Sequence, residues 1–199
     1  VIRENADQPA GAALDLEGRL LITHMKGGSI SRTAADGTVT TLIDTADSKK
    51  LGRCNDLVVR ADGSIYATDF AGGADNRNLI RVAPDGKATI LPSSFKSANG
   101  LAFSPDQSIL YVADFGGKLL KAFDVAADGS VSNERVFIDF KDEYANASVR
   151  GNPDGVKVDS AGNVYCTGPG GIWVLSPKGE KLARLNMNNA NNIAFGGDD

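Results

Sequence analysis

The chain has 199 residues, a length that fits one or two domains, and its 42% hydrophobic and 23% charged residues are typical of a globular protein in water. A net charge of −4, with lysines and arginines scattered singly, argues against nucleic acid as the main partner. No apolar run approaches the ~20 residues of a membrane helix, so we expect no membrane partner either.

The pattern of the chain predicts short strands in four groups of four and no long helix. The first two groups cover residues 12–15, 19–23, 29–32 and 38–43, then 57–59, 64–69, 79–82 and 87–91. The last two cover 101–104, 108–114, 118–124 and 131–137, then 156–159, 163–167, 171–175 and 180–185. Alternating apolar residues on either side of Asp-Gly pairs favour β-hairpins, because such turns need a positive φ at the glycine.

Each group opens on the same short pattern of a small or polar residue, then Gly or Asp, then a strand. The first residues of the four groups are Ala10, Asn55, Asn99 and Asp154, and Asn191 opens a further, partial copy. A repeat of roughly 40 to 50 residues with four strands per copy is typical of a β-propeller. We therefore predict an all-β fold.

Residues 1–5 and 190–199 resemble fragments of two further repeats. We expect a single domain over residues 1–199, with four complete and two partial blades of a six-bladed propeller that is incomplete at both ends. The alternative is a four-bladed propeller closed by the two fragments. The sequence does not determine the cellular compartment. We expect a soluble protein, in the cytoplasm or, if a leader has been removed, in the periplasm or outside the cell.

Three repeats carry an amide or a carboxylate at the first position, namely Asn55, Asn99 and Asp154. The first strand of a blade lies nearest the channel, so residues in this register should converge on one axial point. Their oxygen donors suit Ca²⁺, Mg²⁺ or Mn²⁺ rather than copper or thiolate-bound zinc. The competing interpretation is that each is a turn residue bonded to its own backbone. The shared register favours the metal site.

An ordered set of motifs along the whole chain resembles the SMP-30/gluconolactonase/LRE-like family. They are Arg53-Cys54-Asn55-Asp56, Ser97-Ala98-Asn99-Gly100-Leu101-Ala102-Phe103, Tyr111-Val112-Ala113-Asp114, Gly151-Asn152-Pro153-Asp154-Gly155, Thr167-Gly168-Pro169-Gly170-Gly171-Ile172-Trp173 and Ala194-Phe195-Gly196-Gly197-Asp198-Asp199. The resemblance implies a six-bladed propeller with one divalent cation on its axis. Many members hydrolyse sugar lactones such as gluconolactone.

The resemblance also implies roles for single residues. Asn99 and Asp154 correspond to metal ligands, and Asn55 to a ligand or a contact of the substrate. Arg53 corresponds to a substrate-facing arginine, and Asp154 is the candidate general base. The family's Glu-Gly-Pro motif, whose glutamate completes the metal shell, is absent, and Glu4 does not replace it.

We thus expect a lactonase that uses one divalent cation, with Ca²⁺ as the first choice and Mg²⁺, Mn²⁺ and Zn²⁺ as alternatives. Water would attack the lactone carbonyl while a carboxylate takes its proton. The absence of a Gly-x-Ser-x-Gly motif argues against a serine lactonase. The alternatives are a non-catalytic ligand- or protein-binding propeller and a phosphotriesterase-like hydrolase on the same metal scaffold. The oligomeric state is open.

Several other residues receive structural interpretations. Asp69 and Asp114 should bond neighbouring turns. His24 should lie in a loop or at the surface, with a general-acid role at the channel mouth as the alternative. Cys54 and Cys166 should be free thiols, because no Cys-x-x-Cys pair is present. The loops 70–78 and 141–150 are the candidates for selecting the substrate.

Overall fold

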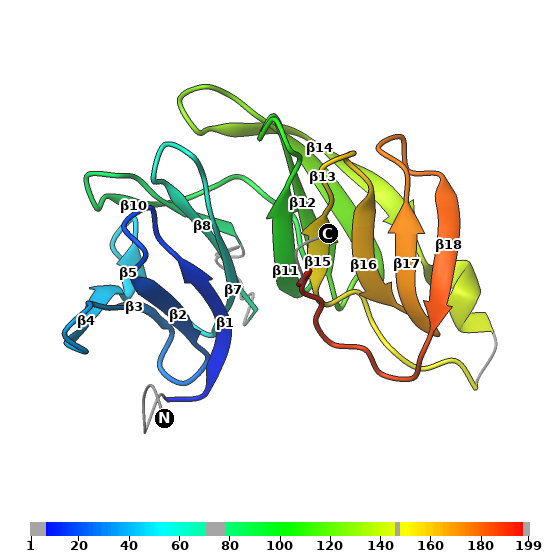
Figure 1. Cartoon of the computed structure of the whole chain (residues 1–199), viewed down its shortest axis with the longest axis horizontal. Coiled ribbons are helices and arrows are strands. Elements are labelled where there is room, and N and C mark those ends of the chain that lie inside the picture. The colour runs from blue at the N-terminus through cyan, green and yellow to red at the C-terminus, as the bar shows by residue number, and fades with distance from the viewer. Residues whose placement is uncertain (1–6, 71–78, 146–147, 197–199) are drawn as a thin grey trace. The chain divides into compact units, whose positions relative to one another are not determined.

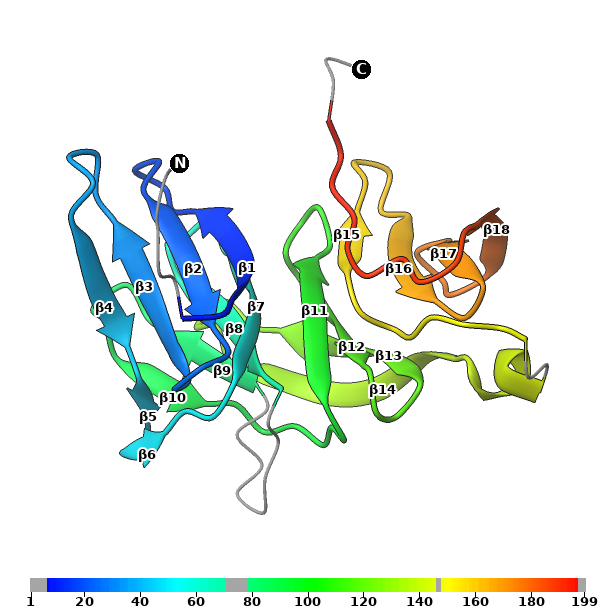
Figure 2. The same cartoon turned by 90° about the horizontal axis from the view of Figure 1, so that it is seen from below.

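The structure is a computed structural model that describes residues 7–70, 79–145 and 148–196. Its strands form four sheets of four antiparallel strands each, and a two-stranded hairpin (Figures 1 and 2). In each large sheet the strands follow one another in chain order. The all-β fold class is therefore confirmed. Among the described residues no helix is long and apolar enough to cross a membrane.

The chain divides into two compact units, of which the first holds two sheets. It comprises Val1–Ala98 and Ala127–Val131. Its first sheet contains β1 (Pro9–Leu14), β2 (Leu20–His24), β3 (Ser29–Thr33) and β4 (Val39–Ile43). Its second contains β7 (Cys54–Val59), β8 (Ile65–Asp69), β9 (Leu79–Val82) and β10 (Ala88–Ile90).

The second unit comprises Asn99–Ala126 and Ser132–Asp199. The third sheet contains β11 (Ala98–Phe103), β12 (Ile109–Asp114), β13 (Leu119–Val125) and β14 (Val131–Asp139). The fourth contains β15 (Val156–Val158), β16 (Val164–Gly168), β17 (Gly171–Leu175) and β18 (Lys181–Asn186). Every predicted strand is present. The single-domain expectation stays a prediction, and the expected fragment at residues 1–5 lies outside the described residues.

Two elements were not predicted. A hairpin of β5 (Thr45–Ala46) and β6 (Lys49–Lys50) follows the first sheet, and a 3₁₀ helix, η1 (Lys141–Ala145), follows β14. The N–H of Asp47 donates to Ala88 O at 3.2 Å, and the Asp47 carboxylate accepts the Ile90 N–H at 2.8 Å. The hairpin thereby covers the edge strand β10, whose free N–H and C=O groups would otherwise invite pairing with another chain.

Tight turns of one kind join many of the strands, and glycine normally closes them. The N–H of the fourth turn residue donates to the carbonyl of the first, as from Gly63 to Arg60 at 2.9 Å. Among the described residues, six such turns end on a glycine with φ between 75° and 86°: Gly18, Gly37, Gly63, Gly86, Gly162 and Gly179. The turn that joins β11 to β12 ends instead on Gln107, with φ 57°.

We expect Gln107→Gly to stabilise the protein by about 0.5–1 kcal/mol. A left-handed backbone costs an L-residue roughly 1–2 kcal/mol, part of which is offset by the greater freedom of glycine in the unfolded chain. Denaturant unfolding measures the change. Gly18→Gln is the reverse control, since no atom lies within 4 Å of a Cβ at Gly18, and it should lose a similar amount. Equal midpoints for parent and both variants would refute the assignment of strain to this turn.

Each unit has its own apolar core. In the first unit Leu21, Ile30 and Ile80 are fully buried together with Cys54. In the second, Phe140, Val156 and Leu175 pack with Cys166 and Trp173. Both thiols are free, as predicted. Burial raises the pKa of Cys54 to about 12 and also raises the pKa of Cys166, so both thiols stay protonated at neutral pH.

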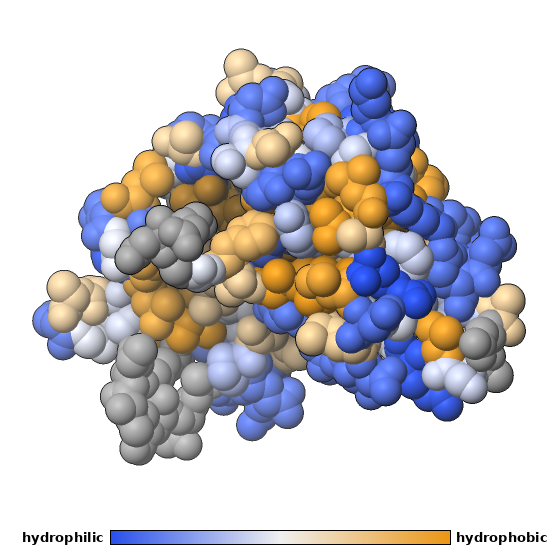
Figure 3. Space-filling view, turned by 45° about the vertical axis from the view of Figure 1, so that its right-hand side comes forward, coloured by the Kyte–Doolittle hydropathy of each residue, from blue (hydrophilic) through white to orange (hydrophobic). Residues whose placement is uncertain are grey.

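The surface is mixed. Figure 3 shows apolar and hydrophilic side chains interspersed over one face. Among the described residues the exposed large apolar side chains include Leu14, Leu16, Val39, Val136, Leu182, Leu185, Met187 and Phe195. Single exposed apolar residues are normal on soluble domains and need no ligand to explain them.

Candidate metal and catalytic site

The first strands of neighbouring sheets lie against one another at their opening residues. In the second unit the Gly100 N–H donates to Asp154 O at 2.9 Å, and the Gly155 N–H donates to Asn191 O at 2.9 Å. A Cβ added to Gly100 would lie 2.1 Å from Asp154 O, so only glycine allows this approach. The structure thus brings the Asn99–Gly100 backbone beside Asp154.

The first unit repeats this packing with other residues. A Cβ on Gly11 would lie 2.8 Å from Asn55 O and 2.7 Å from Asp56 Cα. The register of the repeat therefore has the same physical basis in both units: a glycine lets one inner strand touch the next. Asn55 and Arg53 belong to the first unit, whereas Asn99 and Asp154 belong to the second.

Asn99 is 4% exposed in β11. The amide atoms of Asn99 are not among the buried polar atoms that lack a hydrogen-bond partner in the described part of the chain. Its amide oxygen is of the donor type that hard divalent cations bind.

Asp154 is half-buried and is fixed through its backbone by the second strand of its own sheet. Its N–H donates to Thr167 Oγ1 at 3.0 Å, and that hydroxyl donates to Asn152 O at 3.2 Å. Together with the bond from Gly100, these contacts hold the main chain on both sides.

Sequence reasoning missed these threonines. Thr23 Oγ1 accepts the Gly11 N–H at 2.7 Å and donates to Asn55 O at 2.6 Å, and Thr68 Oγ1 accepts the Asp56 N–H at 3.1 Å. A signal was present, because Thr23, Thr68 and Thr167 hold the same position in the second strand of their sheets. Their hydroxyls pin the start of the first strand in three sheets.

Arg53 is exposed and is held at its backbone by an aspartate. The Asp69 carboxylate accepts the N–H of Gly52 and the N–H of Arg53, both at 2.7 Å. The guanidinium carbon of Arg53 lies 5.5 Å from the centroid of the Phe70 ring, a cation–π distance. Asp114 likewise accepts the Gly117 N–H at 2.8 Å. The predicted turn-bonding role of Asp69 and Asp114 is confirmed.

The expectation for His24 was wrong. It ends β2 and is only 3% exposed, with Nε2 2.8 Å from Ser31 Oγ. Strand β2 also packs against β7 of the neighbouring sheet, so even its last side chain is covered. Sequence position at a strand end therefore does not imply exposure in this fold.

The donor chemistry of Asn99 and Asp154 fits a hard divalent cation, because an amide oxygen and a carboxylate are ligands that Ca²⁺ and Mg²⁺ favour. Among the described residues no three His, Cys, Asp or Glu side chains are grouped around a common point. A metal site would therefore depend on amide oxygens as well as carboxylates. Glu4 lies outside the described residues.

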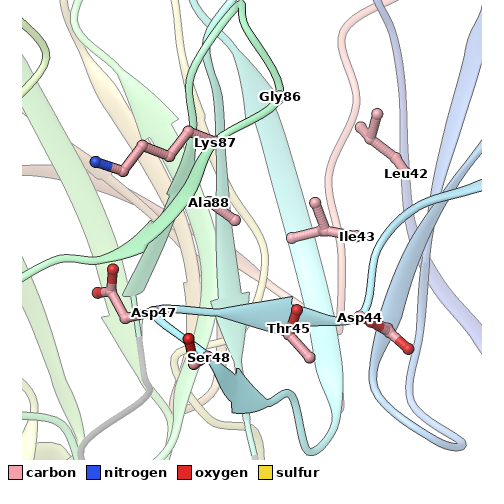
Figure 4. Close-up of a pocket in the computed structure, with 9 residues that line it drawn as sticks. All are labelled: Leu42, Ile43, Asp44, Thr45, Asp47, Ser48, Gly86, Lys87 and Ala88. Carbon is pink, nitrogen blue, oxygen red and sulfur yellow. The ribbon is translucent and has the colours of Figure 1, made fainter.

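A pocket of about 520 Å³ in the first unit carries none of the candidate residues (Figure 4). It lies between the β5–β6 hairpin and the strands β4 and β10. Its carboxylates have structural partners: Asp44 pairs with Lys50 at 2.6 Å, and Asp47 accepts the Ile90 N–H. We assign the pocket no role in the chemistry. Of the two predicted substrate loops, residues 71–78 and 146–147 lie outside the described residues, and part of the second forms η1.

Comparison with known proteins gives one family. The profile described as "SMP-30/Gluconolactonase/LRE-like region" matches residues 3–199. A gluconolactonase of Zymomonas mobilis is 29% identical over 160 residues, which cover 74% of this chain and 45% of that protein. Pentonolactonase XacC of Haloferax volcanii is 27% identical over 199 residues, covering 96% and 64%.

A solved structure gives the same result. A gluconolactonase of Xanthomonas campestris superposes with a TM-score of 0.84 at 28% identity, covering 98% of this chain and 68% of that one. The four-stranded sheets are thus of the β-propeller type found in this family. The chain spans less than two thirds of the length of the two curated relatives described above.

Proposed function

The chain belongs to the SMP-30/gluconolactonase/LRE-like family, and from this premise we propose that it hydrolyses sugar-type lactones in a reaction that depends on a divalent cation. Members of the family commonly use divalent metals. The observation that carries the proposal is the Gly100–Asp154 hydrogen bond, which brings the buried residue Asn99 and its amide beside the carboxylate-bearing Asp154. A gluconolactonase and a pentonolactonase among its relatives support the substrate class.

Asn99 and Asp154 would hold the cation, with Asn55 as a further ligand or substrate contact. When bound, such an ion supplies Lewis-acid polarisation of the lactone carbonyl and acidification of water. Ca²⁺ is the first candidate because its shell accepts amide and carboxylate oxygens in flexible geometry. Zn²⁺, Mn²⁺ and Mg²⁺ are the alternatives to be tried.

The Asp154 carboxylate would act as the general base. It takes a proton from water as the water oxygen bonds to the carbonyl carbon, and the bond from that carbon to the ring oxygen then breaks. The proton passes to the departing alkoxide, so that the products are an open hydroxy acid and the regenerated carboxylate. Arg53, stacked on Phe70, is the candidate for orienting the substrate.

The test is an assay of the full-length protein on gluconolactone and simple γ-lactones after chelation and reloading with Ca²⁺, Mn²⁺ or Zn²⁺. We expect chelation to lower kcat/KM at least 100-fold, and one ion to restore it. Asn99→Ala should require a higher ion concentration for half-maximal activity, whereas the exposed Asn188→Ala should not.

The proposal fails if no lactone is hydrolysed with any of these ions. A phosphotriester substrate should be assayed in parallel, because the same ligands would serve that chemistry. Hydrolysis of the phosphotriester alone would replace the lactonase assignment. Ion binding without any hydrolysis would favour a non-catalytic binding propeller.

A further inference from the structure

A lysine of the third sheet reaches the segment that carries Asp154. Lys118 closes the turn between β12 and β13, and its ammonium donates a hydrogen bond to Asn152 Oδ1, 34 residues further along the chain. Asn152 precedes Asp154 by two residues. Both residues lie in the second unit. The contact therefore ties the loop before β15 to the turn of the neighbouring sheet.

Two aromatic rings surround the same ammonium. Lys118 Nζ lies 5.2 Å from the centroid of the Phe115 ring and 5.1 Å from that of Tyr144, both within the range of a cation–π interaction. The Tyr144 hydroxyl donates to Gly151 O at 2.9 Å and lies 3.4 Å from Asn152 Oδ1. Tyr144 thus contacts the cation with its ring and the loop with its hydroxyl.

The backbone under Lys118 is itself restrained. Lys118 O accepts the Phe140 N–H at 3.1 Å, and the preceding Gly117 donates its N–H to Asp114 at 2.8 Å. A Cβ on Gly117 would lie 2.2 Å from the Asp114 carboxylate, so a larger residue there would displace that side chain. Lys118 has φ 62°, an uncommon value for a residue with a side chain. Such strain is kept where the surrounding structure imposes it.

The charge of Lys118 has no carboxylate partner within ion-pair distance among the residues described. Burial lowers the pKa of Lys118, and the nearby charge of Asp114 partly offsets this. Holding a cation in such surroundings is unfavourable compared with leaving it in water. The hydrogen bond to the Asn152 amide oxygen and the cation–π contacts with Phe115 and Tyr144 offset this cost. Together they fix one position for the ammonium.

We propose that Lys118, Tyr144 and Asn152 form a clamp that positions Asp154 for catalysis. Lys118 and Tyr144 fix Asn152 from one side, and Thr167 fixes Asn152 O and the Asp154 N–H from the other. Lys118 is a positioning residue, since it acts through Asn152. The role assigned to Asp154 rests on the proposed function, whereas the clamp itself is a property of the chain.

The first test compares steady-state kinetics of five variants of the full-length protein: Lys118→Met, Lys118→Arg, Asn152→Leu, the double variant and the control Lys178→Met. Lys118→Met should lower kcat about 10- to 100-fold with KM within about 3-fold of the parent, as expected when a supporting residue is lost. Lys118→Arg keeps the cation and its donors and should recover most of kcat. Lys118→Met combined with Asn152→Leu should be no worse than either alone, because both remove the same contact.

Lys178→Met is the matched control, because this lysine is exposed in the β17–β18 turn of the same unit. Its kcat should equal that of the parent. A Lys118→Met variant that raises KM at unchanged kcat would overturn the clamp and place Lys118 in contact with substrate. The role of Lys118 would be purely structural if Lys118→Met lowers both kcat and Tm strongly and Lys118→Arg does not restore kcat.

The second test needs no activity. Amide hydrogen exchange of the peptide covering residues 150–155, measured on the ion-free protein, should be at least about 10-fold faster in Lys118→Met than in Lys178→Met. Equal exchange in the two variants refutes the clamp. If the parent hydrolyses no lactone, the proposed function fails by itself, and this exchange measurement still decides whether Lys118 holds the loop.

Discussion

Replacing Asp154 by Asn is expected to lower kcat/KM for gluconolactone by about 10³-fold or more. The amide keeps the size of the side chain and leaves the Asp154 N–H bond to Thr167 and the bond from Gly100 in place. It cannot take a proton from water, and general-base catalysis contributes about 10²–10⁴-fold. The loss of a negative charge should also weaken ion binding. Activity measured over a range of ion concentrations separates the two effects.

If Asp154 acts as base, kcat stays low when the ion is saturating. If it acts only as a ligand, excess ion restores kcat. Asp159→Asn is the matched control, since Asp159 accepts the N–H groups of Ala161 and Asn163 in the following turn. This control should retain the kcat/KM of the parent. An Asp154→Asn variant within tenfold of the parent at every ion concentration would remove Asp154 from the mechanism.

Gly100→Ala is expected to be strongly damaging to the second unit. The new Cβ would lie 2.1 Å from Asp154 O and 2.9 Å from Gly155 Cα. Both are backbone atoms, so no side-chain rotation relieves the clash. The strands must separate, which breaks the Gly100–Asp154 hydrogen bond. We expect a loss of about 3 kcal/mol in the free energy of unfolding, combining overpacking with a lost hydrogen bond.

Activity should fall with stability, because separation of the strands moves Asn99 away from Asp154. A shift of about 1 Å in a catalytic group can cost about 10²-fold in rate. Chemical denaturation and kcat/KM are to be measured on the same preparations. Gly196→Ala is the control, since no atom lies within 4 Å of its added Cβ. If Gly100→Ala unfolds at the same denaturant concentration as this control, the close approach of the two strands is wrong.

Much of the fold followed from local patterns. The predicted strands 79–82 and 171–175 coincide with β9 and β17. Alternation of apolar residues and the positive φ that Asp-Gly turns require are properties of a few consecutive residues, so the sequence shows them directly. The β5–β6 hairpin was not predicted from the sequence, because its turn uses Asp47 and Ser48, with φ 45° and 64°, in place of glycine.

Aspartates recur at turn positions of the sequence because their carboxylates bond to the turn backbone. Asp36, Asp62, Asp85 and Asp106 each accept the N–H two residues further on. Hydrogen bonds from the Ser104 hydroxyl and from Ser108 hold the pKa of Asp106 at about 2. These carboxylates therefore serve the turns.

By itself, the sequence determined the all-β class, the succession of strands and turns, the register of Asn55, Asn99 and Asp154, and the family resemblance. Each of these depends on neighbouring residues or on a repeat along the chain. Only the tertiary structure decided that His24 is buried, that threonines of the second strands anchor the first, and that Lys118 reaches Asn152. These contacts join residues of different strands, and packing between strands and sheets, not local propensity, sets which side chains meet.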